Sequence, residues 1–304
     1  MRRWAHRTHL AGLLLFAVAA CGREGRPVPP PAPPAHLSVV DDAGRTVALA
    51  QPPARIVSLS PPVTELLFAL GVGDRLVGRT TWCDYPLAAR QIPSVGDGLN
   101  PNIEAVAARH PDLVVLYRSA LNETAAAQLA RLGIAAVVVQ QDRLEDIARA
   151  ARLLGHLTGT DRAGDSLASA LEQLVAGSGV PRRPRARVAF VVWDNPPVVI
   201  GAGSYLDELA GLVGAANVFH DIAAASATVG LETIVSRDPD LIVVLRDSAT
   251  AEPPGFIRRP EWRAVRAVRQ VRIVYLTGSL FARPGPRAAE AVAEFRRRLE
   301  EAMP

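Results

Sequence analysis

Short hydrophobic runs alternate along this chain with segments whose apolar residues recur at helical spacing. In the first half the runs are RIVSLSP from Arg55, LVGR from Leu76, LVVL from Leu113 and AAVVV from Ala135, and the helical segments are PVTELLFALG from Pro62, a short segment from Ile103 and residues 125–132. Continuous apolar runs of this length are typical of strands that are buried on both faces. Their alternation with helices favours a mostly parallel sheet covered by helices.

The alternation is interrupted once and then resumes. Residues 144–175 keep a helical character, with breaks expected around Gly155 and at Asp161, a residue type that caps helix N-termini. A second series follows, with RVAFVVW from Arg187, SYLDELAGLVG from Ser204, a helix from Leu231, LIVVL from Leu241, IVYL from Ile273 and an amphipathic helix over 287–301. HLSVVDDAGRTVALA, from His36, predicts a β-hairpin. The pattern predicts two α/β lobes, 36–158 and 181–304, joined by a helix over 159–180.

The N-terminal segment predicts export. Arg2, Arg3 and Arg7 precede the apolar run LAGLLLFAVAA, which is too short to span a bilayer but is typical of a secretory signal peptide. The run ends in VAAC, which resembles a bacterial lipobox, so we expect residues 1–20 to be removed and Cys21 to be lipidated. Prolines then recur up to residue 34, so residues 21–35 are expected to form an extended tether.

Net charge excludes nucleic acid as a partner once the signal peptide is removed. The full chain has a formal charge of +4 and a pI near 9.6. Removing residues 1–20 takes away three arginines and no acid, which lowers the charge to +1. A nearly neutral protein has no electrostatic footprint for nucleic acid. With Cys21 lipidated, Cys83 is the only remaining thiol, so no internal disulfide is expected.

One fourteen-residue phrase is present twice. IEAVAARHPDLVVL begins at Ile103 and LETIVSRDPDLIVV begins at Leu231. The two copies agree at Glu104 and Glu232, Arg109 and Arg237, Pro111 and Pro239, Asp112 and Asp240, Leu113 and Leu241, and Val115 and Val243. Each copy predicts a short helix with a glutamate in its first turn, stopped by proline and followed by a buried strand. Helix-dipole stabilisation accounts for either glutamate alone, but it does not require the two copies to match.

The sequence contains no common catalytic or metal-binding motif. It has no Gly-x-Ser-x-Gly elbow, Walker loop, His-Glu-x-x-His or complete dinucleotide fingerprint. The six histidines are scattered without the short spacing of metal ligands. We therefore expect no enzyme activity, no metal site and no cofactor. A secreted hydrolase with dispersed catalytic residues is the remote alternative.

From about Leu37 onward, the chain resembles the substrate-binding proteins of ABC importers for cobalamin, ferric siderophores and haem. The motifs that carry the resemblance are RIVSLSPPVTELLFALG, TTWCDYP, VGDGLNPNIEAVAARHPDLVV, LETIVSRDPDLIVV and FARPGPR, together with the long helical segment. The resemblance implies an α/β fold of two lobes with mostly parallel sheets, joined by one long rigid α-helix, with the ligand in the cleft between them. It also implies that Glu104 and Glu232, one on each lobe, dock on an ABC permease dimer with its ATPase. A two-fold permease presents the same cationic pocket twice, which explains the repeat.

TTWCDYP is most similar to the cobalamin binders, which implies a corrinoid ligand such as cobalamin. Tyr85 is then expected to stack on the corrin face, while Asp84 and Pro86 fix the loop. A large conjugated macrocycle needs flat aromatic and apolar surface with few polar anchors. The other residues expected to line the cleft are Pro61, Trp82, Trp193, Asn195, Phe281 and Arg283. For Trp82 and Trp193, ordinary core packing is the competing interpretation.

Ferric siderophores and haem remain open as alternative ligands. Arginines suited to an acidic chelate are Arg79, Arg118, Arg246 and Arg283, and tyrosines suited to axial ligation of haem iron are Tyr85, Tyr117 and Tyr205. Cys83 lies beside the expected pocket, where it either ligates a metal or packs as a small hydrophobic residue. The sequence thus predicts a monomeric, membrane-anchored, periplasmic or other extracytoplasmic lipoprotein that serves corrinoid transport, with iron-siderophore transport as the alternative.

Overall fold

The computed structural model describes residues 37–177, 184–246 and 254–303. The predicted signal peptide, Cys21 and the tether lie outside this range. Every described strand and helix predicted from the hydrophobic pattern is present. No helix within the described ranges is both long and apolar enough to cross a membrane.

A parallel sheet of four strands forms the first half of the fold, in the order β4-β3-β5-β6. The strands are β3 (Ile56–Ser58), β4 (Leu76–Arg79), β5 (Leu113–Tyr117) and β6 (Ala135–Val139). Their helices are α1 (Pro61–Ala69), α2 (Ile103–Ala107) and α3 (Ala120–Arg131). The predicted hairpin is β1 (Leu37–Val40) paired with β2 (Thr46–Leu49). Helix α3 begins five residues earlier than expected because the Ser119 hydroxyl caps it, accepting from the N–H of Asn122 at 3.2 Å.

The second sheet is parallel in its centre and antiparallel at one edge. Strand β7 (Ala186–Asp194) pairs in parallel with β11 (Leu241–Arg246) and β9 (Ala215–Asn217), and β11 pairs in parallel with β12 (Ile273–Thr277). The antiparallel edge, β8 (Pro197–Ile200) and β10 (Ser226–Thr228), was not predicted. The helices are α6 (Tyr205–Leu212), α7 (Leu231–Arg237), α8 (Arg266–Arg269), α9 (Gly278–Phe281) and α10 (Ala288–Ala302). This second α/β unit confirms the predicted fold class.

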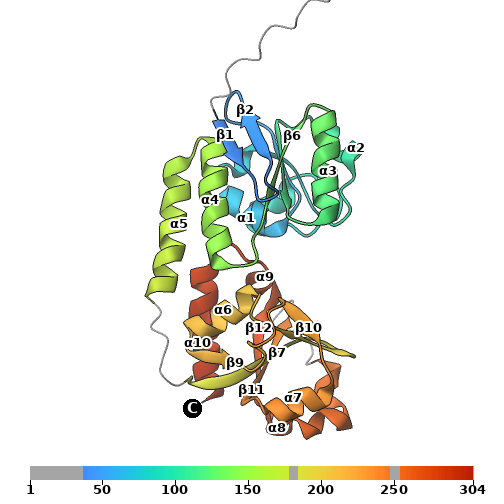
Figure 1. Ribbon diagram of the computed structural model, residues 1–304, viewed down its shortest axis with the longest axis vertical. Helices are drawn as coiled ribbons and strands as arrows, with labels where there is room; N and C mark the ends of the chain where they lie inside the picture. Colours follow the sequence, from blue (N-terminus) through green and yellow to red (C-terminus); the bar gives the residue numbers. More distant parts are fainter. Residues whose placement is uncertain (1–36, 178–183, 247–253, 304) are drawn as a thin grey trace, which may run out of the picture. The chain divides into compact units, whose positions relative to one another are not determined.

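Two helices follow β6 and precede β7 in the chain, α4 (Leu144–Thr158) and α5 (Asp161–Ala176), and Figure 1 shows them side by side. The break predicted around Gly155 is wrong, since α4 continues through this residue. The chain turns at Gly159, whose φ of +73° suits glycine, and Thr160 precedes α5. Gly155 and Gly164 instead allow the two helices to approach closely, because a Cβ on Gly164 would lie 2.6 Å from the carbonyl oxygen of Ala151. Helix α5 falls within the predicted linking segment 159–180.

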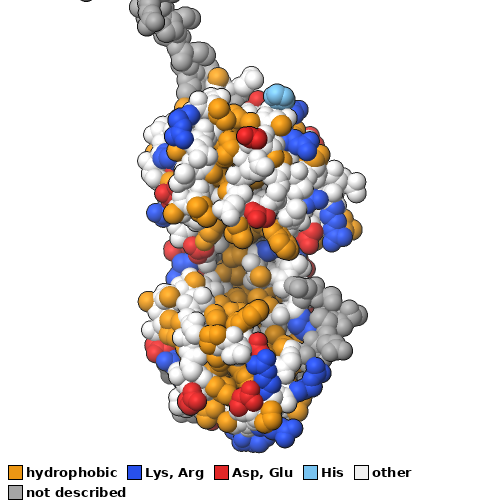
Figure 2. Space-filling view, turned by 90° about the vertical axis from the view of Figure 1, so that its right-hand side faces the viewer, with side chains coloured by type: hydrophobic (Ala, Val, Ile, Leu, Met, Phe, Trp, Pro, Cys, Tyr) orange, Lys and Arg blue, Asp and Glu red, His pale blue; other side chains and the backbone are white. Residues whose placement is uncertain are grey.

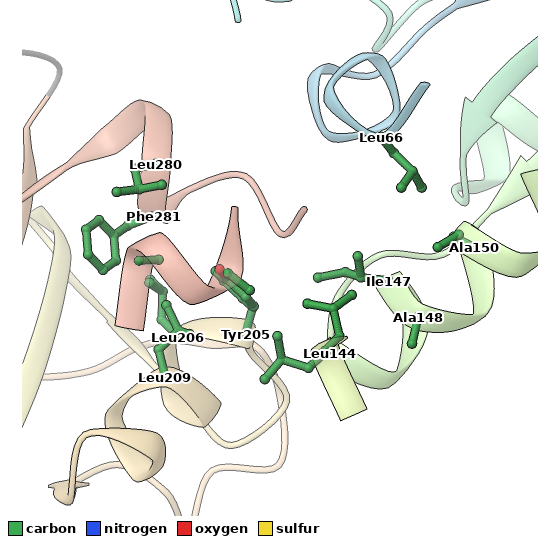
Figure 3. Close-up of a cluster of buried hydrophobic side chains, with 14 of the residues drawn as sticks. Leu66, Leu144, Ile147, Ala148, Ala150, Tyr205, Leu206, Leu209, Leu280 and Phe281 are labelled. Atoms are coloured by element: carbon green, nitrogen blue, oxygen red, sulfur yellow. The ribbon is translucent and has the colours of Figure 1, made fainter. Parts of the chain in front are cut away.

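One hydrophobic core continues from the first sheet to the second. Figure 3 shows Leu66 of α1, Leu144 and Ile147 of α4, Tyr205 of α6 and Phe281 of α9 in this cluster. Two smaller clusters cover the opposite faces of the two sheets. All described residues belong to one compact unit, which is not divided at residues 158 or 181. The predicted lobe boundaries at these residues therefore stay a prediction.

Candidate functional site

Three aromatic side chains are exposed in the described part of the chain, and all three are predicted ligand-binding residues. Trp82 is 62% exposed, Tyr85 42% and Trp193 62%, whereas every other described Phe, Tyr and Trp side chain is buried or half-buried. Aromatic side chains with this much exposed surface are available for contact with a ligand or a partner protein. The core-packing interpretation of Trp82 and Trp193 therefore does not fit the structure.

The TTWCDYP loop follows β4 and is held by buried polar contacts. The Arg79 guanidinium donates hydrogen bonds to the carbonyl oxygens of Ala89 at 2.9 Å and Thr80 at 2.8 Å. Cys83 has no exposed surface, and its Sγ lies 3.1 Å from the hydroxyl of Thr80. Cys83 thus packs as a small buried residue, and Arg79 is committed to the loop rather than to a ligand. Among the described residues, no cluster of three or more His, Cys, Asp and Glu side chains is arranged to hold a metal ion.

Two predicted site residues that lie far apart in the sequence form an ion pair with each other. Arg283, which is 15% exposed at its side chain, forms an ion pair with Asp84. Its Nη2 also donates to the carbonyl oxygen of Trp82 at 3.0 Å, and its Nη1 lies 3.6 Å from a carboxylate oxygen of Glu65. The hydrogen bond from Arg283 holds the pKa of Asp84 below its usual range. Arg283 therefore fastens the segment after α9 to the TTWCDYP loop.

A second arginine, not predicted as a site residue, makes the same connection. Arg287 donates to both oxygens of Glu65, at 2.7 and 2.8 Å, and to the carbonyl oxygen of Ser279 at 2.7 Å. Its guanidinium carbon lies 3.8 Å from the centre of the Tyr85 ring. Burial raises the pKa of Glu65 although Arg287 opposes the shift. Two features of the sequence pointed to this pair. Glu65 is the only acidic residue in the apolar segment PVTELLFALG, and Arg287 is the last residue of the motif FARPGPR.

Trp193 and Asn195 lie where β7 turns into β8. The indole N–H of Trp193 donates to the carbonyl oxygen of Asn195 at 3.0 Å, and both residues are exposed. Neither has a hydrogen bond or ion pair with the TTWCDYP loop within the described residues, so this turn is a separate part of the candidate site. Pro61, half-buried, is the first residue of α1. Figure 2 shows a recess at mid-height on one face of the molecule, with hydrophobic side chains inside it.

Phe281 corrects one expectation. It has no exposed surface and packs edge-to-face against Phe295, with ring centroids 6.2 Å apart. The sequence could not separate it from its neighbours, because a four-residue helix turns successive side chains in different directions. In this structure Phe281 belongs to the shared core and offers no surface to a ligand.

Most residues proposed for the alternative ligands have other contacts. Tyr205 is 2% exposed, and the Tyr117 hydroxyl donates to Asp142 at 2.6 Å. Arg118 pairs with Glu123 at 3.5 Å, while Arg246 lies 4.6 Å over the ring of Tyr275. Of the three tyrosines considered for axial ligation, only Tyr85 is exposed.

The two copies of the repeated phrase form the same corner of the fold. Asp112 accepts the backbone N–H of Arg55 at 2.9 Å, and Asp240 accepts that of Arg187 at 2.9 Å. Each of these arginines also donates to a carbonyl oxygen at the end of the short helix that precedes the aspartate in the chain, at 2.6 and 2.8 Å. These contacts join the helix end to the start of the neighbouring strand, which gives the repeated aspartates a structural role.

The side chains of the repeated glutamates do not take part in the contacts of these corners. Glu104 and Glu232 are the second residues of α2 and α7, and both are exposed. No hydrogen bond or ion pair joins either carboxylate to another described residue. The matched corners therefore present one free carboxylate from each half of the fold.

Comparison with known proteins identifies the family. The family profile described as periplasmic binding protein matches residues 56–280, which is most of the chain. The chain belongs to this family. It is therefore the substrate-binding protein of an ABC importer, an extracytoplasmic binding protein rather than an enzyme.

Several relatives cover almost all of the described body. The ABC transporter substrate-binding lipoprotein YvrC of Bacillus subtilis is 29% identical over 85% of this chain and 83% of its own. The vitamin B12-binding protein of Vibrio cholerae is 26% identical over 80% of this chain and 88% of its own. The crystal structure of BtuF, the periplasmic vitamin B12-binding protein of V. cholerae, aligns with a TM-score of 0.68, 25% identity, and coverage of 83% and 98%. The haem-binding protein RhuT from Roseiflexus sp. RS-1 aligns with a TM-score of 0.72, 23% identity, and coverage of 82% and 99%, a likeness of fold.

Proposed function

We propose that this protein binds cobalamin or a related corrinoid and delivers it to an ABC permease. The observation that carries the proposal is the set of exposed aromatic side chains Trp82, Tyr85 and Trp193. A flat macrocycle binds by stacking on such surfaces, and a few polar anchors orient it. Asp84, Asn195, Arg283 and Pro61 are the proposed neighbours that shape the site and supply polar groups. The vitamin B12-binding relative from V. cholerae supports the same ligand.

The charges near the loop fit a ligand with few acidic groups. Arg283 and Arg287 are both paired with carboxylates of the protein, and Arg79 is bonded to backbone carbonyls. A ligand with several carboxylates or catecholates would have to displace these partners, whereas the amide groups at the edge of a corrinoid would not.

The second candidate ligand is haem, and one observation favours it. Tyr85 is an exposed tyrosine beside the candidate site, where its hydroxyl would be an axial ligand for haem iron.

Calorimetric titration separates these ligands. The chain without its predicted signal peptide and tether is titrated with cyanocobalamin, haemin and a panel of ferric siderophores. We expect tight one-to-one binding of cyanocobalamin alone. Binding of haemin or a siderophore in its place would keep the family and reject the corrinoid.

We further propose that Glu104 and Glu232 dock the protein on its permease, while a lipid on Cys21 anchors it to the membrane. Each free carboxylate fits an arginine pocket on one permease subunit. Replacing either with alanine is expected to weaken docking by about 2–5 kcal/mol if the ion pairs are buried, and to leave ligand affinity unchanged. Co-sedimentation with permease in nanodiscs measures the first effect and calorimetry the second. Loss of ligand binding in either variant would contradict this assignment.

A further inference from the structure

We propose that Arg287 is a positioning residue, which holds the Tyr85 ring in place as a one-sided platform for the ligand. The inference rests on the proposed function, in which Tyr85 contacts the ligand. The Arg287 guanidinium lies over the ring, 3.8 Å from its centre, while the Tyr85 side chain remains 42% exposed. The guanidinium covers one face of the ring, and the proposal assigns the remaining exposed surface to a flat ligand.

The guanidinium is itself fixed from behind. Glu65 accepts from its Nε and Nη2 in a two-point ion pair, and the carbonyl oxygen of Ser279 accepts a further bond from Nη2. The side chain of Glu65 is only 1% exposed and that of Arg287 only 14%, so water competes little for these bonds. Two parallel hydrogen bonds set the plane of the guanidinium, which a single-point contact does not.

Tyr85 has no other partner of comparable strength. No hydrogen bond or ion pair to its side chain is present among the described residues, and its exposed surface leaves it free to adopt other rotamers. A cation held against the face of an aromatic ring contributes about 0.5–2 kcal/mol, enough to favour one ring orientation over its alternatives. The Arg287 contact therefore decides how the platform is presented.

The contact also ties the platform to the second half of the fold. Arg287 directly precedes α10 and follows the segment whose Arg283 holds Asp84, so both arginines reach the TTWCDYP loop from the same side. A displacement of the segment 282–287 would remove the support of Tyr85 and the anchor of Asp84 together. Ligand affinity should then depend on this segment even where it does not touch the ligand.

A double-mutant cycle on cyanocobalamin affinity tests the positioning. Tyr85→Ala and Arg287→Met are each expected to weaken binding at least tenfold, because both remove the ordered platform. If Arg287 acts through Tyr85, adding Arg287→Met to Tyr85→Ala causes no further loss. The proposal would be overturned if Arg287→Met weakened cyanocobalamin binding equally in the wild type and in Tyr85→Ala. It would also be overturned if Arg287→Met alone caused no loss of affinity. Arg287→Lys, which retains the charge without the two-point ion pair, is expected to be intermediate.

Two controls separate positioning from misfolding. Arg287→Met leaves the buried Glu65 carboxylate with only the more distant Arg283, at 3.6 Å, so the variant Glu65→Leu/Arg287→Met, which removes both charges, is measured beside it. It should fold and still bind weakly. Arg297→Met, on the exposed face of α10, removes an arginine whose ion pairs within the described residues are with Glu294 and Glu301, and it should bind as the wild type does.

Hydrogen–deuterium exchange without ligand gives an independent readout. Residues 80–87 are expected to exchange faster in Arg287→Met while the strands exchange as in the wild type. Unchanged exchange in the loop would overturn the positioning. If the wild type does not bind cyanocobalamin, the proposed ligand is wrong, but faster exchange confined to this loop still supports the positioning.

Discussion

Trp82, Tyr85 and Trp193 show how far single residues can be interpreted from sequence. Their motifs indicated binding, and all three side chains are exposed in the structure, so their role in binding stays a prediction. Phe281 carried a similar signal but is buried, because exposure depends on contacts with α10 that no local pattern records. Arg287 and Glu65 were missed for the same reason, since 222 residues separate the two partners.

The Asp84–Arg283 ion pair should make stability depend on pH. The folded-state pKa of Asp84 is lowered, so the pair stabilises the protein above the unfolded value of about 4, and this stabilisation is lost as pH falls through the lower folded pKa. We expect Asp84→Asn to lower the free energy of unfolding at pH 7 and to approach the wild type once the pH falls below the folded pKa of Asp84. Urea unfolding across this range measures the difference. In an Arg283→Gln background, the effect of Asp84→Asn on the free energy of unfolding should no longer depend on pH. If it still does, the Asp84–Arg283 ion pair is not the cause of the pH dependence.

Val271 is a single residue in an unfavourable conformation. Its φ is +56°, although it is β-branched, and it ends α8 with the same backbone hydrogen bonds with which Gly133 ends α3. We expect Val271→Gly to raise the free energy of unfolding by about 1 kcal/mol, because relief of strain exceeds the added entropy of the unfolded chain. Urea unfolding measures the change. Gly133→Val, at a site with no atoms near the new Cβ, should lower the free energy of unfolding by a similar amount. If both variants were as stable as the wild type, the positive φ would not be a source of strain.

At the scale of helices and strands, the sequence predicted most of what lies in the core. Buried strands such as Leu113–Tyr117 are continuous apolar runs, and the repeated phrase located two corners of the fold. The short edge strands were missed: β8 is the brief apolar run PVVI directly after a proline, β10 is SAT, and their pairing depends on a chain reversal and on neighbours. Glycine was ambiguous in the same way: Gly155 permits close helix packing, whereas Gly159 ends a helix, and the sequence does not distinguish these uses.

Two helical glycines should respond in opposite directions to the same substitution. Gly164→Ala places a Cβ 2.6 Å from the carbonyl oxygen of Ala151, so we expect a loss of about 1–3 kcal/mol as α4 and α5 move apart. Gly211→Ala, in α6 with no atom within 4 Å of the new Cβ, should gain up to about 1 kcal/mol from helix propensity. Thermal unfolding compares the two. A stabilising Gly164→Ala would show that the helices do not pack as closely as described.

At the scale of the whole molecule, the two sheets share one core and several polar connections. The core cluster includes residues of α1, α4, α6 and α9, and Glu208 of α6 accepts the N–H of Leu144 at 2.8 Å. Arg283 and Arg287 add their ion pairs with Asp84 and Glu65. A hinge that opened widely would expose this core and break these bonds. The sequence could predict the family and the fold, but not this continuity, which arises from contacts between distant segments.

We therefore expect ligand binding to tilt the two halves by only a few degrees. Crystal structures of the protein with and without cyanocobalamin measure the rotation of one sheet relative to the other. Closure by tens of degrees would contradict the rigid core. Solution scattering, with an unchanged radius of gyration expected, controls for the crystal lattice.

The proposed function requires that the exposed aromatic side chains hold a corrinoid. The most direct measurement is calorimetric titration of cyanocobalamin into the wild type, Tyr85→Ala and Trp193→Ala, with Val271→Gly as a folded control away from the proposed site. We predict tight one-to-one binding by the wild type and the control, and at least tenfold weaker binding by both aromatic variants. Absence of binding by the wild type would show that cyanocobalamin is not the ligand, and unchanged binding by both aromatic variants would show that these side chains do not hold it.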